Sequence, residues 1–523
     1  MSRKAVARWA ATAALMTVGL PVAVAGAQSS PPIGAYTTSG AWSFVSAPKL
    51  HPPKLSTTAP TKTKQLASGY FLTANFPNIT VGKPMSGQGG PLILDSQLRP
   101  VWFFPLPTNV VALDLKQQTF EGKPALSWWQ GVINNVGVTV SGTVEVVNQH
   151  YDKMATLTGT DGWVISPHEV VISGRDAWVT SYKNVPNVDL SSYHGASNGT
   201  LYDFAVQKYD LVTGKLLYTW DAYNPGGTPN VPLSESEGSA PPIPTVAWDA
   251  YHGNSIQLVG SHEFLVSMRN TWAAYLVDTN TGKVVWTLGG KNSSFKLPSN
   301  AQFQFQHTVL YLPGNKVSVF DDHCCAALGG GKFAPPTGPS RGLVLQLDYK
   351  NYTASLANQY PHSSPSLDAA FTGSTQVLPN GNVLVGWGSE PYLSEYSSSG
   401  KLLLDAKWPG SVDLSYRVLL TQSWVGTPSY PPSGAARRAG GHTWVYASWD
   451  GATQVAKWQV LAGSNAQHLK VVATAGKSGY ETAIYLKGGY GAYRVRALAA
   501  NGRVLGTSGV FPKASTIVST PGY

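Results

Sequence analysis

The stretch FLVSMRNTWAAYLVDTNTGKVVWTLGGK, residues 264–291, decides the fold of this protein. It contains two apolar runs that flank the polar segment 278–282, which ends in glycine. Such a segment suits a tight turn with one left-handed position, and the apolar runs suit β-strands. The same form recurs in YDLVTGKLLYTW (209–220) and EYSSSGKLLLDAKW (395–408). The stretch therefore predicts a β-hairpin that is repeated along the chain.

Turns of this kind, each flanked by apolar segments, recur between residues 69 and 425. They lie near residues 95–96, 148–151, 210–214, 278–282, 348–351 and 395–400. Their spacing of roughly 50–70 residues is typical of propeller blades and other repeat arrays. A four-stranded blade buries its faces only against neighbouring blades, so the ring must close. We therefore predict an all-β fold in which residues 69–425 form a six-bladed β-propeller.

The pattern changes after residue 428, where short strands follow one another more closely. Residues 428–513 contain TWVYASWDGA, AKWQVLAG and AYRVRALAANG, with turn residues between them. This arrangement favours a small β-sandwich of fibronectin type III character, with Trp458 and Tyr493 on candidate central strands. A seventh propeller blade is the alternative. Residues 514–523 are interpreted as a tail.

The N-terminus has the pattern of a secretory signal. Residues 1–27 have three basic residues among the first eight, continue with an apolar stretch and end in the small residues Ala-Gly-Ala. An uncleaved anchor is the alternative, but the break at 19–21 and the small residues favour cleavage. No later stretch is long and apolar enough to span a bilayer. We therefore predict a secreted or cell-envelope protein that is not an integral membrane protein. Residues 28–68, rich in Ser, Thr and Pro, predict an extended segment.

The composition agrees with many short strands and excludes some partners. The 523 residues include 17 Trp, 25 Tyr, 54 Gly and 37 Pro, a mixture typical of strands separated by turns. The formal net charge is +10, and loss of the three basic residues of the leader lowers it to +7. No basic run follows that would track a nucleic-acid backbone, so we predict no nucleic-acid partner. A mild positive field favours anionic small molecules or anionic cell-surface polymers.

The only two cysteines, Cys324 and Cys325, are adjacent. A disulfide framework therefore does not hold the chain together. The pair forms either a strained disulfide between neighbours or two thiols. Zinc sites space their cysteines to allow tetrahedral geometry, and no phosphate-binding loop is present. We predict neither a metal nor another cofactor.

Three polar residues stand out in the aromatic, β-rich region 246–315: His252, Arg269 and His307. Imidazoles and a permanently charged guanidinium are what a site needs to hold and transfer an anionic group. Each residue taken alone is more simply a satisfied polar residue of a strand. Their joint arrangement points to function, because residues of different blades can converge on the central channel of a propeller.

Residues 90–425 resemble the bacterial arylsulfotransferase family, in its branch of exported six-bladed propellers. The resemblance is carried by GPLILDSQLRPVWFFPLP, SPHEVVISG, WDAYHGNSIQLVG, FLVSMRNTWAAYLVDTNTGKVVWTLGGK and FQFQHTVLYLPGN. It implies transfer of a sulfuryl group from a phenolic sulfate ester to a phenol, without a nucleotide donor. A histidine becomes sulfated in between. The partners implied are therefore a small phenolic sulfate and a phenol.

Carried over position by position, the resemblance implies that His307 is the sulfated nucleophile, and that His168, His252 and Arg269 complete the catalytic set. The chemistry suits these residue types. Sulfuryl transfer, like phosphoryl transfer, is expected to pass through a loose transition state with charge on three oxygens. Arg269 offers a planar charged fork, and neutral imidazoles donate hydrogen bonds or attack sulfur.

Aromatic residues from the same region are candidate walls for the phenolic rings. We predict substrate contacts for Trp272, Tyr251 and Trp129, and interpret most other aromatics as blade core. Asp249 and Glu169 are predicted to orient neighbouring histidines. The histidines without a clear partner are interpreted as surface or loop residues: His194, His262, His323, His362 and His442. The alternative to an enzyme is a non-catalytic propeller that binds an anionic or sulfated ligand at the cell surface. Such a protein would need the positive charge but not the nucleophile.

Overall fold

The computed structural model describes ten stretches of the chain. They are residues 35–58, 64–78, 83–134, 137–325, 327–329, 332–333, 338–410, 412–439, 441–512 and 516–517. The predicted leader lies outside them. Across these stretches, none of the helices has the length and apolar character needed to cross a membrane.

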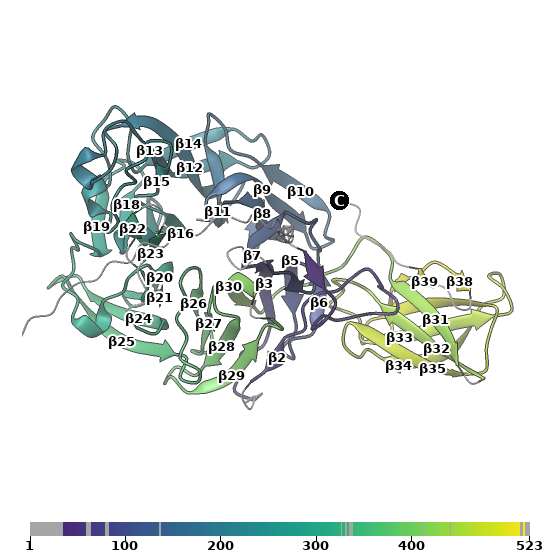
Figure 1. The fold of residues 1–523 in the computed structure, drawn as a ribbon. Coiled ribbons are helices and arrows are strands. Elements are labelled where there is room, and N and C mark those ends of the chain that lie inside the picture. Colours follow the sequence, from purple (N-terminus) through teal and green to yellow (C-terminus); the bar gives the residue numbers. More distant parts are fainter. Residues whose placement is uncertain are drawn as a thin grey trace, which may run out of the picture.

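Six antiparallel sheets stand side by side in a ring (Figure 1). From the innermost strand outward, the first blade consists of β30 (Asp413–Thr421), β3 (Tyr70–Pro77), β5 (Gly90–Leu94) and β6 (Pro100–Phe103). The second consists of β7 (Val111–Phe120), β8 (Lys123–Ile133), β9 (Thr139–Asn148) and β10 (Lys153–Leu157). The third consists of β11 (Val164–Ser173), β12 (Asp176–Val188), β13 (Gly199–Asp210) and β14 (Leu216–Asp221). The short strand β15 (Ala247–Trp248) pairs with β13.

The other three blades follow the same plan. They are β16 (Gly253–Val259), β17 (Glu263–Met268), β18 (Ala273–Asp278), β19 (Val284–Gly289); β20 (His307–Leu312), β21 (Lys316–Asp321), β24 (Arg341–Asp348), β25 (Thr353–Pro361); and β26 (Ser374–Val377), β27 (Val383–Gly386), β28 (Tyr392–Tyr396), β29 (Leu402–Lys407), with β2 (Ser56–Thr57) added outside. Two pairs stand apart: β1 (Tyr36–Thr37) with β4 (Met85–Ser86), and β22 (Ala327–Gly329) with β23 (Lys332–Phe333). The 3₁₀ helices are η1 (Ser191–Tyr193), η2 (Leu233–Glu235), η3 (Arg269–Thr271) and η4 (Ser299–Ala301).

Each of the six turns recognised in the sequence joins the third and fourth strands of one blade. The aspartates explain the recurrence. Asp278 Oδ1 accepts the N–H groups of Asn280 and Thr281 at 3.0 and 2.8 Å, and Gly282 takes the left-handed position with φ 70°. Asp210 and Gly214 do the same in the preceding blade. The predicted all-β fold, a six-bladed propeller followed by a small β-sandwich, is confirmed.

The ring closes because strand β30, late in the chain, pairs with β3, the first long strand. Glutamines then join neighbouring innermost strands. Gln257 of β16 donates to the Tyr311 carbonyl of β20 at 3.1 Å and accepts the Tyr311 N–H at 2.6 Å. Gln118 joins β7 to β11 and Gln376 joins β26 to β30 with similar pairs of bonds. These bonds satisfy backbone groups where no strand ladder runs between blades.

Apolar cores fill the joints between blades. One cluster contains Val144 of the second blade and Tyr209 of the third, and another contains Phe204 of the third and Phe264 of the fourth. Each blade face is therefore covered only by its neighbour. Closure of the ring therefore buries the apolar faces of all six blades, which a single blade would leave exposed to solvent.

The sandwich follows the propeller as two packed sheets (Figure 1). One consists of β35 (Glu481–Lys487), β32 (His442–Ser448), β31 (Ser433–Ala439) and β39 (Thr516–Ile517). The other consists of β34 (Lys470–Gly476), β33 (Lys457–Gly463), β36 (Ala492–Leu498), β37 (Val504–Thr507) and β38 (Phe511–Pro512). Its fibronectin type III character stays a prediction.

The sandwich docks on the first two blades through the segment 449–453. Asp450 Oδ1 accepts the Phe103 N–H at 3.1 Å. The Gly451 N–H donates to the Val101 carbonyl at 2.7 Å, and its own carbonyl accepts the Tyr151 hydroxyl at 2.8 Å. These contacts involve one end of the sandwich, so its strands extend away from the propeller.

Candidate active site

The four predicted catalytic residues come from three blades and meet at one end of the innermost strands. His168 lies in β11, His252 directly precedes β16, His307 begins β20, and Arg269 begins η3 after β17. The rings of His168 and His252 are 4.8 Å apart, and Tyr416 of β30 contacts the rings of His168 and His307 at 5.5 and 6.4 Å. All four residues are at most 5% exposed. The structure thus gathers them into one buried cluster.

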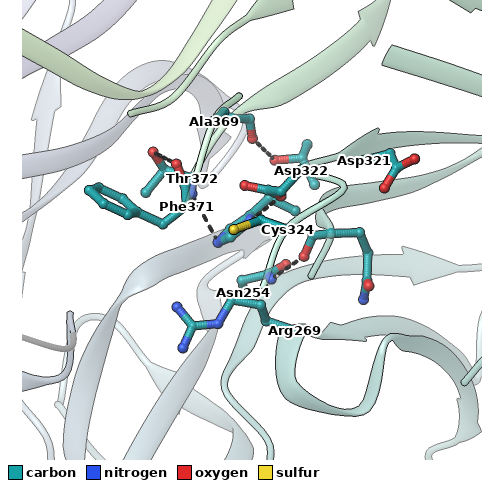
Figure 2. Close-up of polar contacts among 12 residues, drawn as sticks. Asn254, Arg269, Asp321, Asp322, Cys324, Ala369, Phe371 and Thr372 are labelled. Atoms are coloured by element: carbon teal, nitrogen blue, oxygen red, sulfur yellow. Dashed lines mark hydrogen bonds and ion pairs between the residues drawn. The ribbon is translucent and has the colours of Figure 1, made fainter. Parts of the chain in front are cut away.

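His307 has a partner on each ring nitrogen. Nδ1 lies 2.8 Å from Asp322 Oδ2, and the Thr372 N–H donates to Nε2 at 3.3 Å. An N–H donor at Nε2 requires a lone pair there, so the proton of the neutral ring is on Nδ1. Asp322 and Thr372 gather with Cys324 beside Arg269 (Figure 2). This tautomer is the one that leaves Nε2 free to act as a nucleophile.

Asp249 holds the opposite side of the cluster. Its carboxylate bonds His252 Nδ1 and lies 3.9 Å from Arg269 Nη2. Arg269 Nε donates to Asn270 Oδ1 at 2.9 Å, and the Asn270 amide donates to the Asp249 carbonyl at 2.5 Å. The guanidinium also lies over the Phe305 ring, 4.3 Å from its centre. The prediction that Asp249 orients a histidine agrees with this geometry.

Burial lowers the pKa of all three histidines well below the ordinary value. The positive charge of Arg269 is the next cause for His252 and His307, whereas the neighbouring His252 is the next cause for His168. Burial also raises the pKa of Asp249 to about 6 and raises that of Asp322 well above its usual range. The histidines are therefore neutral at pH 7, as a nucleophile and a base must be.

Backbone strain is concentrated around this cluster. Left-handed φ values occur at His252 (52°), Trp272 (50°), Phe305 (59°), Thr308 (49°) and Thr372 (65°). For residues other than glycine each such conformation costs on the order of 1–3 kcal/mol, and it persists where the surroundings over-determine it. The strained backbone aims the histidine and the Thr372 N–H at the centre of the cluster.

Next to the histidines, a buried ion network crosses the channel. Arg417 Nη1 lies 2.7 Å from Asp114 Oδ1 and 2.8 Å from Glu169 Oε2, and Lys116 contacts both carboxylates. Arg417 also donates to Thr308 Oγ1 at 3.0 Å. Strands β7, β11, β20 and β30 are thus tied together. The prediction that Glu169 orients a histidine is wrong, because two cations compete successfully for its carboxylate.

The three predicted aromatic walls lie in different surroundings. Trp272 lines a cavity of about 510 Å³ between the fourth and fifth blades, and it borders the narrow space beside Asp249. Tyr251 is fully buried, and its hydroxyl donates to the Val231 carbonyl at 2.8 Å. Trp129 is also fully buried and donates to the Ile165 carbonyl at 3.2 Å. Both belong to the cores between blades, so only Trp272 keeps a position next to open space.

Cys324 and Cys325 form a disulfide and are buried against Phe305, with Trp272 packed beside them. The disulfide alternative of the sequence analysis is therefore the one that the structure has. The Phe305 ring thus packs between the disulfide and the guanidinium of Arg269, so the disulfide helps to fix the position of Phe305 beside the cluster.

Several functional neighbours were not predicted. Asp322, Thr372, Tyr416 and Arg417 contact the cluster or its supporting network. For Asp322, the sequence does contain an indication, because two adjacent aspartates at 321–322 end an apolar strand. His362, interpreted from the sequence as a surface or loop residue, is 4% exposed and bonds Asp405 at 3.1 Å. That interpretation is wrong, because the pair is enclosed near the fifth and sixth blades.

Within the described stretches, no group of three or more His, Cys, Asp or Glu residues is arranged to hold a metal ion. The cluster offers instead three imidazoles and a guanidinium, which together suit an anionic group with several oxygens.

Comparisons with known proteins gave one family match and several similar solved structures. A search of curated protein sequences gave no match. Similar solved structures include a protein of unknown function from Bacteroides caccae (11% identity, 67% of this chain and 98% of that chain, TM-score 0.39) and the Dos1 propeller (10% identity, 77% and 76%, TM-score 0.30). The family model described as arylsulfotransferase (ASST) matches residues 116–408, a span that contains all four clustered residues. The chain belongs to the arylsulfotransferase family.

Proposed function

We propose that this protein is an exported aryl sulfotransferase that moves a sulfuryl group from a phenolic sulfate ester to a phenol through a sulfated His307. The observation that carries the proposal is the fixed tautomer of His307. Its Nδ1 proton is held by Asp322, and among the described residues its Nε2 lone pair accepts only the Thr372 N–H, at 3.3 Å. The predicted leader, residues 1–27, supports export.

In the first step, Nε2 of neutral His307 attacks the sulfur of the donor ester. The N–S bond forms, the bond between sulfur and the phenolic oxygen breaks, and the phenolate leaves with the electron pair. The sulfated imidazole becomes a cation that keeps its Nδ1 proton and donates it as a hydrogen bond to Asp322. Thr372, freed from the lone pair, can donate its N–H to a sulfuryl oxygen.

In the second step, an acceptor phenol attacks the same sulfur and His307 leaves in its neutral form. His252 is the base that takes the phenolic proton. Its Nδ1–H donates to the Asp249 carboxylate, which leaves the lone pair on Nε2 to accept that proton. Arg269 and His168 bind the sulfuryl oxygens on which charge develops. Each such donor contributes on the order of 2–4 kcal/mol to stabilising the transition state.

Mass spectrometry after incubation with 4-nitrophenyl sulfate tests the proposal. We expect an added SO₃ group on the peptide that contains His307, together with one equivalent of 4-nitrophenolate released before an acceptor is added. Addition of phenol should remove the adduct and form phenyl sulfate. Binding of the ester without adduct or turnover would identify a binding propeller instead.

The pH dependence of the two steps should differ. His307 is active when neutral, and its pKa is lowered, so the release of 4-nitrophenolate in the first turnover should stay constant from pH 8 to below the ordinary histidine value of about 6.5. Asp249 must be ionised to hold His252, and its pKa is raised to about 6, so transfer to phenol should decline as the pH falls through about 6. Stopped-flow absorbance and steady-state rates at each pH separate the two. A common decline centred at 6.5 would contradict the assignment.

Replacement of Asp322 by asparagine should slow the first step by on the order of 10²–10⁴-fold, as loss of the orienting carboxylate does in other catalytic triads. An amide can turn its NH₂ toward Nδ1 and so force the proton to Nε2, which removes the nucleophilic lone pair. Asp321→Asn is the control, because Asp321 is equally buried but bonds the Arg341 side chain and the His323 backbone N–H, and no imidazole ring. Equal effects of the two changes on the burst rate, in folded protein, would argue against the role of Asp322.

A further inference from the structure

The positive charge of the chain is concentrated in the sandwich. Residues 433–512 contain nine Lys or Arg and two Asp or Glu, a formal charge of 9 − 2 = +7. Residues 28–432 contain 24 basic and 25 acidic residues, a formal charge of 24 − 25 = −1. The sandwich therefore accounts for the net positive charge of residues 28–512, and a positive electrostatic field attracts polyanions.

Neither acidic residue of the sandwich is available to offset this charge at its distal end. Asp450 is buried at the contact with the propeller and accepts the Phe103 N–H. Glu481 accepts hydrogen bonds from the Ser46 hydroxyl and the Val45 N–H of the N-terminal segment. Both lie at the end of the sandwich that touches the rest of the chain.

An aromatic row lies on the outer face of the sheet β31–β32–β35. Trp444 and Tyr485 face each other across β32 and β35, with ring centres 5.4 Å apart, and are 37% and 50% exposed. His442 lies 5.3 Å from the Tyr485 ring. Large aromatic side chains are normally buried, so a contiguous exposed group of them indicates a binding surface.

Basic side chains frame this row. Arg437 pairs with Trp444 across β31 and β32, and Lys487 follows Tyr485 on the same face two residues along β35. Both are exposed. Strands lie about 4.8 Å apart, which places the Arg437 and Tyr485 positions roughly 10 Å apart across the sheet. The face thus presents aromatic rings with cations beside them. Among the described residues of its strands the one carboxylate is that of Glu481, at the far end of β35, and it is already bound by Val45 and Ser46.

We propose that this face, formed by Arg437, His442, Trp444, Tyr485 and Lys487, binds an acidic polysaccharide. Rings of this kind pack against the apolar faces of sugar rings, while the cations pair with carboxylates along the polymer. The site would hold the enzyme on an anionic surface polymer while the propeller acts on small phenols. It is independent of the chemistry proposed for His307.

Two other polyanions fit less well. A nucleic-acid strand stacks successive bases on parallel aromatic platforms, whereas the Trp444 and Tyr485 rings are inclined at 69°. A membrane surface is entered by large aliphatic side chains together with Trp or Phe. The outward positions of β32 and β35 carry no aliphatic side chain larger than alanine. They are His442, Trp444, Tyr446, Glu481, Ala483, Tyr485 and Lys487.

The test measures binding of the full-length mature chain to immobilised polygalacturonate, with neutral dextran and oligothymidylate as comparison ligands. We expect binding to polygalacturonate that weakens from 50 to 500 mM salt, and none to dextran. Trp444→Ala/Tyr485→Ala and Arg437→Gln/Lys487→Gln should each raise the Kd about tenfold or more. Transfer from 4-nitrophenyl sulfate should be unchanged in both, because the changes lie outside the propeller.

Two matched controls separate the face from general charge and general apolarity. Arg503→Gln removes an exposed cation from the other sheet of the sandwich, and Tyr352→Ala removes an exposed tyrosine from the propeller. Each should change the Kd less than about twofold, as expected of residues outside the contact. The proposal is overturned if the aromatic variant binds polygalacturonate as the wild type does. The proposal is also overturned if oligothymidylate binds through the same residues and more tightly than polygalacturonate does. It is overturned as well if the variants bind polygalacturonate normally and lose only self-association, measured by sedimentation velocity.

Discussion

Replacement of His307 by alanine should abolish sulfuryl transfer while the propeller remains folded. The change removes the only nitrogen to which sulfur is proposed to bond, so both the adduct and the burst of 4-nitrophenolate should disappear. Loss of a nucleophile lowers turnover by on the order of 10⁴–10⁶-fold, and neighbouring groups cannot replace it. Mass spectrometry and stopped-flow absorbance on the same sample measure both quantities.

The chain offers a matched control in His362. This histidine is also buried and also bonds a carboxylate, Asp405, but it is not part of the cluster. His362→Ala should therefore destabilise the propeller as much as His307→Ala does and still form the adduct on His307. A His307→Ala protein that turns over 4-nitrophenyl sulfate at the wild-type rate would remove the nucleophile assignment. An adduct found on His168 or His252 would move it to that residue.

Replacement of Arg417 by methionine should destabilise the whole ring. Arg417 neutralises Asp114 and Glu169 in a site where all three are nearly inaccessible to solvent. Removing one partner of a buried ion pair leaves an uncompensated charge and costs about 3–5 kcal/mol. Denaturant unfolding followed by tryptophan fluorescence, with 17 Trp in the chain, measures the loss.

Arg175→Met is the control for this prediction. Arg175 lies 2.9 Å from Asp210, nearly as close as Arg417 lies to its partners, but its side chain is 47% exposed. Solvent screens such a pair, so its loss should cost less than about 1 kcal/mol. Adding Asp114→Asn to Arg417→Met should restore part of the stability by removing one unpaired carboxylate. Equal losses in the two single variants would show that the network does not support the ring.

The hairpins illustrate what local chemistry makes predictable. An aspartate that caps its own turn and a glycine at a left-handed position act within five residues, as at 278–282, so the turn can be recognised without knowing the fold. Counting such turns is enough to predict six blades, since each turn joins the same two strands of its blade. His168, His252, Arg269 and His307 could likewise be singled out by residue type and by resemblance.

The partners of those residues were less accessible to prediction. Glu169 follows His168 in the chain, yet adjacent residues of a strand point to opposite sides. Glu169 therefore turns toward Arg417 of β30, a strand that lies some 250 residues later in the chain and completes the first blade. Trp129 and Tyr251 were predicted to face substrate because they are aromatic, and Tyr251 directly precedes His252. Their burial depends instead on which neighbouring blade covers them.

The sequence by itself determined the blade repeat, the number of blades and the change of strand pattern after residue 428. These follow from turn chemistry and strand periodicity, which act over a few neighbouring positions. The residues proposed to carry sulfuryl transfer were singled out by residue type and by the resemblance to the arylsulfotransferase family. Only the tertiary structure decided the tautomer of His307, the pairing of Glu169 with Arg417 and the aromatic row framed by Arg437 and Lys487. Each of these depends on groups from separate strands meeting in space, and ring closure and sheet register alone bring them together.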